Sequence, residues 1–424
     1  MDFNIFLNRF GISSENFVNK ENEPIPFSEG YIYEVEQRRD IHVCPECGST
    51  HAHVMGSFYA EVNCSQNEHI KDVLRIKKIR FRCVDCGKTY TNKIKGIEPK
   101  TTITDQVMQF IINDFKKPYT FQQISKRYNF SRSRILELFD EKIPFVPRRE
   151  MPEILCIDEI RFSEDIEQKY CCVLYDFLKK EIVDIIRNRQ LPYLKEYFSN
   201  INLEERNKTK VFISDMYDAY ATVCSSYFKN AIHIVDKFHI VTQLTRAVNQ
   251  LRVKTMNVEC SKGSQEYNFM KTNWKYFLCH ERKIPNKIYW HKQTNKEAHY
   301  DDLVFKCIQL NQDLWAGYSC LQDLYNFPRF STNYESVSFI DFLSKKLINT
   351  NNETLMKVGE TFKKWNKEIA NAYTVNAKKI NYTNAIAESI NNQLKTITKS
   401  ANGYKNFDRF RRRAMLIITY SKPK

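Results

Sequence analysis

The chain has 424 residues and carries 65 Lys and Arg against 50 Asp and Glu, a formal net charge of +15. A basic balance of this size favours phosphate-rich partners, above all nucleic acid, and the length allows about two to four domains. No stretch is apolar for long enough to predict a membrane span, so we expect no membrane partner. Of the 13 cysteines only four form Cys-x-x-Cys pairs, which indicates reduced thiols and a metal site rather than a disulfide framework.

The first predicted element is a zinc ribbon over residues 41–100, after an N-terminal segment of residues 1–40. The segments CPECG and CVDCG each place two thiols at the spacing that a tetrahedral zinc site uses. Cys64 and the histidines between the two pairs remain alternative ligands. Residues 71–100 contain 10 Lys and Arg and 3 Asp and Glu, an excess of seven positive charges that favours contact with phosphate over a merely solvated face. We expect a closed, structural Zn²⁺ site with the ligands Cys44, Cys47, Cys83 and Cys86.

A helix-turn-helix is predicted over residues 101–146, from the segment TFQQISKRYNFSRSRILELFDEK. Its apolar residues fall on one stripe of each of two helices, and Ser131 is placed to cap the second helix. The first turn of a recognition helix contacts DNA in the major groove, so Arg132, Ser133 and Arg134 are candidate DNA ligands. Two short packed helices without a DNA-binding role are the alternative. Prolines around residue 147 mark a linker to the next domain.

Residues 151–240 alternate between strand-like and helical segments in the order βββαβαβ. CIDEIRF and FISDMYDAY each carry an aspartate, Asp158 or Asp215, at the end of an apolar row. Two such carboxylates above one sheet predict a divalent cation site for Mg²⁺, because hard cations prefer oxygen ligands and relieve the repulsion between the acids. Taken alone, an aspartate at the end of a strand is usually a turn or cap residue, and the presence of the second acid favours the metal site. Asp236, before KFH, is a further candidate ligand.

Residues 241–380 are helical and aromatic in pattern, and contain all four tryptophans, so we expect an all-helical insertion in which Trp and Tyr are core residues. In residues 381–424, Ile390, Leu394 and Ile397 form an apolar stripe, and Glu388 lies on the other side of the same helix. Lysines and arginines follow in a basic track. The candidate DNA ligands there are Lys395, Lys399, Arg411, Arg412 and Arg413.

Taken in order, these motifs resemble the DDE transposases of bacterial insertion sequences, specifically the ISL-three family. The resemblance rests on the two cysteine knuckles, the helix-turn-helix, CIDEIRF, FISDMYDAY, VDKFHIVTQL and YTNAIAESINNQLKTITKSANGYKNFDRFRRR, and covers residues 40–415. The chain departs from the family pattern around the acid, where Ala385 and Ser389 stand at positions usually held by glycine.

The resemblance implies a multidomain α/β protein: a zinc ribbon, a helix-turn-helix, and an RNase H-like core with a mixed five-stranded sheet. The core is interrupted by the helical insertion and completed by its last helix and the basic tail over 381–424. The implied catalytic acids are Asp158, Asp215 and Glu388, holding Mg²⁺ or Mn²⁺.

The implied reaction cleaves the ends of the element and joins their 3′ hydroxyls to target DNA, without a covalent protein–DNA intermediate. The resemblance also implies that the ribbon and helix-turn-helix bind the terminal inverted repeats. Work on two DNA ends requires at least a homodimer on DNA, and the expected location is the bacterial cytoplasm, at the nucleoid. Two alternatives remain: a DNA-binding regulator whose core has lost catalysis, and a nuclease or resolvase that hydrolyses without strand transfer.

Overall fold

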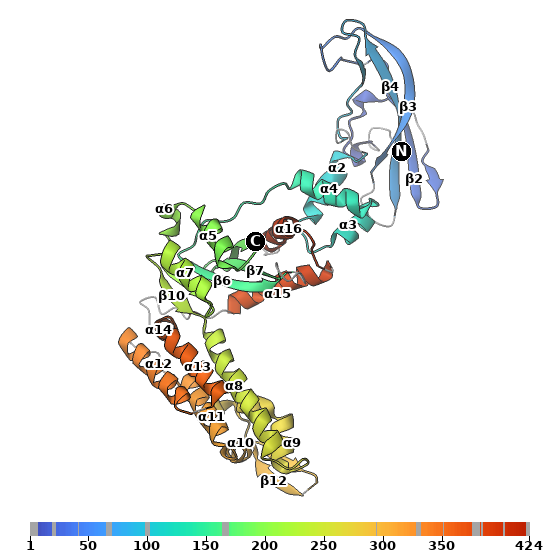
Figure 1. Ribbon diagram of the computed structural model, residues 1–424. Helices are drawn as coiled ribbons and strands as arrows, with labels where there is room; N and C mark the ends of the chain where they lie inside the picture. Colours follow the sequence, from blue (N-terminus) through green and yellow to red (C-terminus); the bar gives the residue numbers. More distant parts are fainter. Residues whose placement is uncertain are drawn as a thin grey trace. The chain divides into compact units, whose positions relative to one another are not determined.

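The computed structural model describes residues 7–18, 23–40, 42–64, 70–97, 102–162, 169–293, 295–327, 332–350, 352–374, 382, 385–401 and 403–420, apart from the side chains of residues 385–387. The chain forms two compact units (Figure 1). Unit 1 comprises Met1–Pro147 and Thr396–Lys424, and unit 2 comprises Arg148–Lys395.

Unit 1 contains a five-stranded sheet. Its strands are β1 (Ile25–Phe27), β2 (Gly30–Glu36), β3 (Ala52–Asn63), β4 (Lys71–Cys83) and β5 (Thr89–Thr91), preceded by the short helix η1 (Ser14–Asn16). The order is β1-β2-β4-β3, with β5 also paired to β4. Strands β3 and β4 are antiparallel and β2 runs parallel to β4. The structure therefore differs from the expected boundary at residue 40, because β1 and β2 belong to the same sheet as the ribbon.

The buried side of β4 changes along its length. Leu74 and Ile76 join a core with Leu7 and Phe10 near the start of the chain. Further along β4, Ile79, Phe81 and Cys83 are buried with Cys44 and Tyr90 instead. The register shift between Val54 and Gly56 in β3 lies in this second half, and such irregularities increase the local twist of a ribbon.

The helices of unit 1 are α2 (Asp105–Asp114), α3 (Phe121–Tyr128), α4 (Arg132–Lys142) and α16 (Phe407–Tyr420). Helix α3 begins with a capping box between Thr120 and Gln123 and ends at Asn129, whose φ of 56° reverses the chain. The hydroxyl of Ser131 accepts from the Arg134 amide at 3.1 Å, which confirms its predicted role as the cap of α4. The two helices and the turn that the sequence predicts are therefore present.

Unit 2 is built on a mixed five-stranded sheet, as predicted. Its order is β10-β9-β6-β7-β8, with β6, β7 and β8 antiparallel and β9 and β10 parallel to β6. Helices α5 and α7 bury one face of the sheet, through Phe198 and Tyr220 against Leu155 and Ile157 of β6. The elements are β6 (Ile154–Arg161), β7 (Tyr170–Asp176), β8 (Glu181–Ile186), α5 (Leu191–Ser199), α6 (Leu203–Arg206), β9 (Val211–Ser214), α7 (Asp218–Tyr227) and β10 (Ile232–Val235).

The insertion follows β10 and is largely helical, with α8 running beside α11 and α13 (Figure 1). The prediction that it is all helical is wrong, because β11 (Ile288–His291) and β12 (Lys296–His299) form an antiparallel hairpin. Its aromatic and β-branched residues favour a strand once a partner strand is available. The helices are α8 (Lys237–Val258), α9 (Gln265–Thr272), η2 (Trp274–Phe277), η3 (Glu281–Lys283), α10 (Tyr300–Gln309), α11 (Gln312–Tyr325), α12 (Asn333–Ile348), α13 (Glu353–Lys364) and α14 (Asn366–Tyr373), and α15 (Ala385–Ser400) follows the insertion.

The tryptophans of the insertion do not all lie in a core. Trp365 is buried at 5% exposure, as expected, whereas Trp274 and Trp290 are each 50% exposed and Trp315 is 42% exposed. No described helix of either unit combines the length and the apolar character that crossing a membrane requires.

Candidate active site and zinc site

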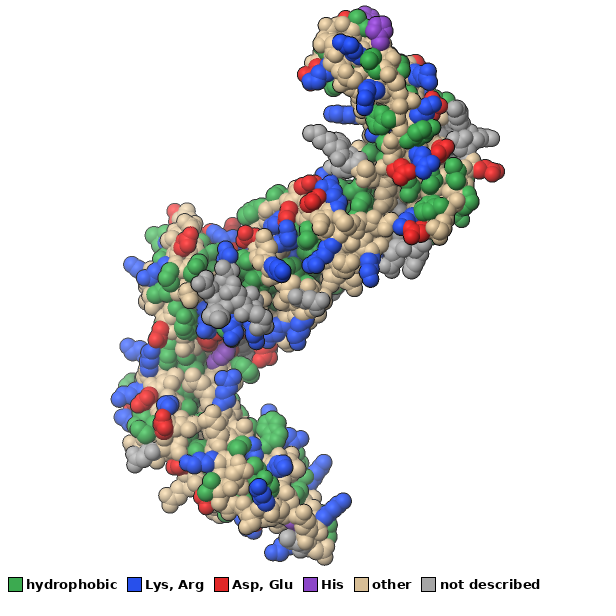
Figure 2. Space-filling model, turned by 45° about the vertical axis from the view of Figure 1, so that its right-hand side comes forward, with side chains coloured by type: hydrophobic (Ala, Val, Ile, Leu, Met, Phe, Trp, Pro, Cys, Tyr) green, Lys and Arg blue, Asp and Glu red, His purple; other side chains and the backbone are tan. Residues whose placement is uncertain are grey.

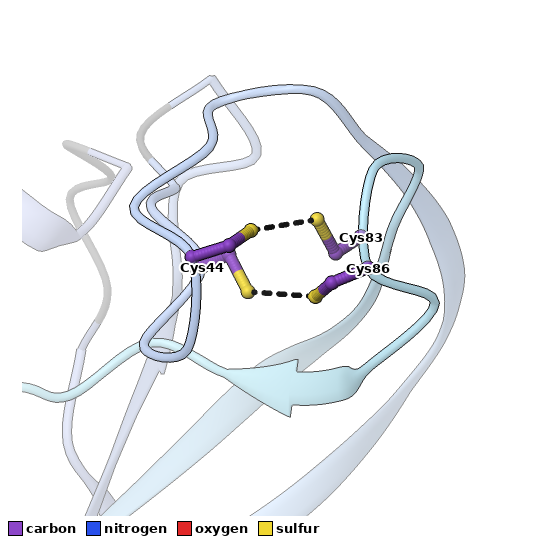
Figure 3. A group of neighbouring side chains, drawn as sticks. Cys44, Cys83 and Cys86 are labelled. Atoms are coloured by element: carbon purple, nitrogen blue, oxygen red, sulfur yellow. Dashed lines mark hydrogen bonds between the residues drawn. The ribbon is translucent and has the colours of Figure 1, made fainter.

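The four predicted zinc ligands converge in unit 1. The Sγ atoms of Cys44 and Cys86 lie 3.6 Å apart, and those of Cys47 and Cys83 lie 3.5 Å apart (Figure 3). All four sulfurs lie within 4.8 Å of one another. A tetrahedral zinc with Zn–S bonds of about 2.3 Å separates its sulfurs by about 3.8 Å, so this cluster has the size that one ion needs.

The two knuckles share one backbone geometry. Gly48 and Gly87 both have a φ of 73°, in the region that favours glycine. Their amides donate to the carbonyls of Cys44 and Cys83 at 2.9 and 3.1 Å. A backbone hydrogen bond from Cys86 lowers the pKa of the Cys83 thiol to about 7, which favours the thiolate that a metal binds.

Asp158 lies in β6, on the face of the sheet opposite Leu155 and Ile157. Its Oδ1 accepts the backbone N–H of Glu159 at 2.8 Å, and its Oδ2 accepts the side-chain amide of Asn391 at 2.7 Å. Burial raises the pKa of this carboxyl. Asp158 is therefore a largely buried acid whose two oxygens are each fixed by one donor.

Asp215 directly follows β9 and comes level with Asp158. The parallel register pairs Cys156 with Ile213, so two residues further along each strand the two aspartates face the same side. Burial raises the pKa of Asp215 to about 6, and the negative charges of Glu159 and Asp158 act in the same direction. Among the described residues, the buried Oδ1 of Asp215 has no hydrogen-bond partner. A buried carboxylate oxygen without a donor, beside a second acid, fits a divalent cation.

Asp236 is buried at the end of β10, where it begins α8. Its Oδ1 accepts the amide of Phe238 at 3.1 Å, and its Oδ2 lies 3.8 Å from Nε2 of His239. The charge of His239 also acts on Asp158 and Asp215, where it lowers both pKa values. Asp236 is thus a helix cap next to the two other aspartates.

Glu388 lies exposed in the first turn of α15, and the apolar stripe predicted for this helix is buried at Ile390, Leu394 and Ile397. Asn391, one turn after Glu388, is the residue that contacts Asp158. Positions three apart are neighbours on a helix surface, so Glu388 lies next to this contact. Asn391 was not among the residues predicted from the sequence, although its spacing of three residues from Glu388 was a usable signal.

The carboxylates do not form a ready coordination sphere. The four cysteines are the one group, within the described ranges, in which three or more His, Cys, Asp or Glu side chains bring donor atoms close enough to share an ion. Asp158 and Asp215 are level on adjacent strands, and Glu388 is not gathered with them.

The candidate DNA ligands of α4 differ from one another. Arg132 and Ser133 are exposed in the first turn of the helix. Arg134 is engaged on its own helix, with its guanidinium 3.0 Å from Glu137 and 3.4 Å from Glu141.

The arginine run of α16 requires a correction. Arg413 is fully buried and donates to the backbone carbonyls of Lys117 and Tyr119 at 3.0 and 2.5 Å. Arg412 binds Asp140 at 2.6 Å, and Arg411 donates to the carbonyl of Val146 at 2.8 Å. These arginines hold α16 against the other helices of unit 1, so the prediction that Arg413 binds DNA is wrong. Lys395 and Lys399 are exposed on α15.

The family model of the ISL-three DDE transposases, described as a transposase, matches residues 155–414, more than half of the chain. The match begins in β6, just before Asp158, and ends within α16, so it includes Asp215 and Glu388. The comparison with curated proteins gives no match. The chain belongs to the ISL-three family of DDE transposases.

Proposed function

We propose that this transposase binds the terminal inverted repeats of its own insertion sequence, cleaves the ends and joins their 3′ hydroxyls to target DNA. The observation that carries the proposal is the pair Asp158 and Asp215, level on adjacent strands, with a buried Asp215 oxygen that has no donor among the described residues. The sheet order and the helix α15 that follows the insertion fit the RNase H-like core that such chemistry uses.

Asp158, Asp215 and Glu388 are the proposed ligands of Mg²⁺ or Mn²⁺. A divalent cation bound there supplies charge stabilisation for in-line displacement at phosphorus and lowers the pKa of a bound hydroxyl. The chain itself orients Asp158 through the Glu159 amide and Asn391. Asp236, whose Oδ1 caps α8, is proposed as a further ligand of the same ion.

Unit 1 is the proposed DNA-binding part, with Zn²⁺ as a structural ion on its four cysteines. Arg132 and Ser133 are exposed where a recognition helix contacts base edges. Lys395 and Lys399 are exposed on α15, the last helix of the core, and are proposed to contact the DNA backbone near the cleaved phosphate.

The ribbon of β3 and β4 adds a second basic surface to unit 1. Lys78, Arg80 and Arg82 alternate on one side of β4 and form no ion pair within the described part of the chain. Arg75, by contrast, is neutralised by Glu34 and Glu61. Figure 2 shows Lys and Arg side chains beside hydrophobic ones over the ribbon, at the upper end of the view. Unpaired cations of this kind suit a phosphate backbone.

Work on two ends and a target requires at least a dimer on DNA, at the nucleoid of a bacterial cell. This proposal follows from the reaction.

The test is cleavage and joining of a DNA fragment that carries the element's own ends, with Mg²⁺, Mn²⁺ or EDTA. Asp158→Asn, Asp215→Asn and Glu388→Gln keep the side-chain shape and remove one charge each. The matched control is Asp218→Asn, since Asp218 is an exposed acid of the same unit, paired with Lys364 at 2.6 Å.

We expect metal-dependent joining that is lost in the three variants and kept in Asp218→Asn, with end-binding intact in all four. End-binding without cleavage under any metal would identify a regulator instead. Cleavage without a joined product would identify a nuclease.

A further inference from the structure

A buried chain of three polar side chains connects the last core helix to the sheet. Tyr175 of β7 donates its hydroxyl to Oδ1 of Asn391 on α15, and Asn391 donates its Nδ2 to Oδ2 of Asp158 at 2.7 Å. Tyr175 is 1% exposed and Asn391 is 6% exposed. Strands β6 and β7 thus meet helix α15, which follows more than 200 residues later in the sequence, at one carboxylate.

The direction of this chain is fixed by chemistry. An ionised carboxylate only accepts hydrogen bonds, so the amide of Asn391 must turn its NH₂ group toward Asp158. Its carbonyl oxygen then needs a donor on the other side, and the Tyr175 hydroxyl supplies it. With the amide reversed, two oxygens would face each other beside Asp158 and the Tyr175 hydroxyl would lose its acceptor. Asp158 therefore determines which way the amide faces. The Tyr175 hydroxyl, by donating to the amide oxygen, holds the amide in the position from which it orients Asp158.

Helix α15 does not need this network in order to pack. Ile390, Leu394 and Ile397 already bury an apolar stripe along the helix. Burying an amide and a phenol hydroxyl costs free energy unless both are satisfied, so a purely structural role would be served better by apolar residues. The polar residues stand where α15 contacts Asp158, one turn from Glu388.

We propose that Asn391 and Tyr175 are positioning residues that set the orientation of Asp158 and hold α15 in the place from which Glu388 completes the metal site. This inference rests on the proposed function, because it assigns Asp158 and Glu388 as metal ligands. The Asn391 amide donates one hydrogen bond to Oδ2 of Asp158, and the Glu159 backbone amide donates one to Oδ1, so each oxygen has one lone pair engaged. As far as the described residues go, each oxygen therefore keeps one lone pair for a cation.

The experiment uses the full chain and two readouts. The first is binding of Mn²⁺ alone, followed by electron paramagnetic resonance, and the part that depends on the site is the difference from Asp158→Ala. The second is the Mg²⁺ concentration that gives half-maximal cleavage of end DNA. The variants are Asn391→Ala, Asn391→Leu, Tyr175→Phe and the double variant Tyr175→Phe/Asn391→Ala. Gln393→Ala is the matched control, an exposed amide on the same helix.

We expect Asn391→Ala and Asn391→Leu to weaken Mn²⁺ binding and to raise the Mg²⁺ midpoint, each by about 10- to 100-fold, as for other residues that orient metal ligands. Tyr175→Phe should have a smaller effect, and no further effect when Asn391 is already alanine, since the hydroxyl acts only through the amide. Gln393→Ala should match the wild type. End-binding should change little in Asn391→Leu, which keeps the buried volume although Asp158 and Tyr175 each lose a hydrogen-bond partner.

Either of two results overturns the inference. One is wild-type Mn²⁺ binding and an unchanged Mg²⁺ midpoint in Asn391→Leu. The other is that the losses of Mn²⁺ affinity in Tyr175→Phe and Asn391→Ala add up in the double variant and run in proportion to the losses of thermal stability. Both residues would then be merely structural. A wild-type protein that binds Mn²⁺ through Asp158 but never cleaves DNA would contradict the proposed function and leave this inference testable by Mn²⁺ binding.

Discussion

Replacing Arg413 by alanine should unfold unit 1 at a much lower denaturant concentration. The guanidinium donates to the backbone carbonyls of Asp114, Lys117 and Tyr119 at 3.4, 3.0 and 2.5 Å, and it lies 5.3 Å from the ring centre of Phe121. The variant leaves these acceptors without their donor, and each such loss costs about 1 to 3 kcal/mol.

The gain from no longer burying a charge offsets part of this loss. Burial lowers the pKa of Arg413 to about 10, well below the usual value of a guanidinium, which corresponds to about 3 kcal/mol of desolvation. Three such losses, of about 3 to 9 kcal/mol together, less this gain leave a net destabilisation of about 0 to 6 kcal/mol. The value expected within this range is about 3 to 5 kcal/mol, as is seen when one partner of a buried charged group is removed. With a urea m-value of about 2 kcal/mol per molar, the midpoint falls by about 1.5 to 2.5 M.

Two spectroscopic signals separate the units. All four tryptophans, at positions 274, 290, 315 and 365, lie in unit 2, so their fluorescence follows that unit alone, whereas far-ultraviolet circular dichroism follows both. Arg413→Ala should lower the midpoint of one dichroism transition and leave the fluorescence transition in place. Arg413→Lys should fall between, because a single ammonium cannot reproduce the planar fork. Lys405→Ala, an exposed cation in the same unit, should change the midpoint by less than about 0.3 M.

An Arg413→Ala protein with the wild-type dichroism midpoint would refute the reasoning, because the carbonyl contacts would then contribute no net stability. Equal shifts of both signals would show instead that the stability of unit 2 depends on α16.

Acidification should weaken unit 2 through His233, since burial lowers its pKa to about 4, below the unfolded value of 6.5. The stability that the neutral ring contributes is complete above pH 6.5 and is lost as the pH falls toward 4. Between pH 7 and 5 the free energy of unfolding of the wild type should therefore fall by about 2 kcal/mol more than that of His233→Gln. Urea titration followed by tryptophan fluorescence measures this difference. Removal of zinc by a chelator, or Cys83→Ser, should disrupt the knuckles and weaken end-binding while tryptophan emission stays constant; chelator-resistant binding would argue against a structural ion. Arg80→Ala with Arg82→Ala should weaken binding to every duplex alike and reduce the salt dependence by about two counterions, and an unchanged slope would exclude the ribbon from the DNA interface.

The parts of the structure that sequence could predict are those in which local pattern decides. The cysteine knuckles are fixed by spacing, because two residues between thiols suffice for both to reach one ion. The strands of unit 2 alternate or are continuously apolar, and the same alternation places Asp158 and Asp215 at matching positions. Ser131 caps α4 through its own hydroxyl, and the amide that it accepts from is only three residues further along the chain.

The parts that failed depend on partners far away in the chain. A run of arginines predicts a phosphate-binding surface when only the sequence is considered. The carbonyls that bind Arg413 lie almost 300 residues earlier, so no local pattern indicates them. The hairpin of β11 and β12 resembles its helical surroundings in composition, and only pairing makes it a strand pair. The parallel pairing of β2 with β4 likewise leaves no local signature in the segment before the first knuckle.

Asn391 and Asn392 show where the limit lies. They are identical residues next to each other on one helix, and the helical pattern alone favours the one opposite the apolar stripe. An asparagine beside that stripe is the better candidate for a functional residue only if the strand that faces it carries a charged acceptor within hydrogen-bond distance, as Asp158 does for Asn391. Helical periodicity says which side of a helix is buried, but it says nothing about the polar groups on the surface that covers it. The second amide oxygen adds a further condition, since it needs a donor, which Tyr175 of another strand supplies. Finding such a residue therefore requires the three elements in space, even when the acids themselves can be predicted from the sequence.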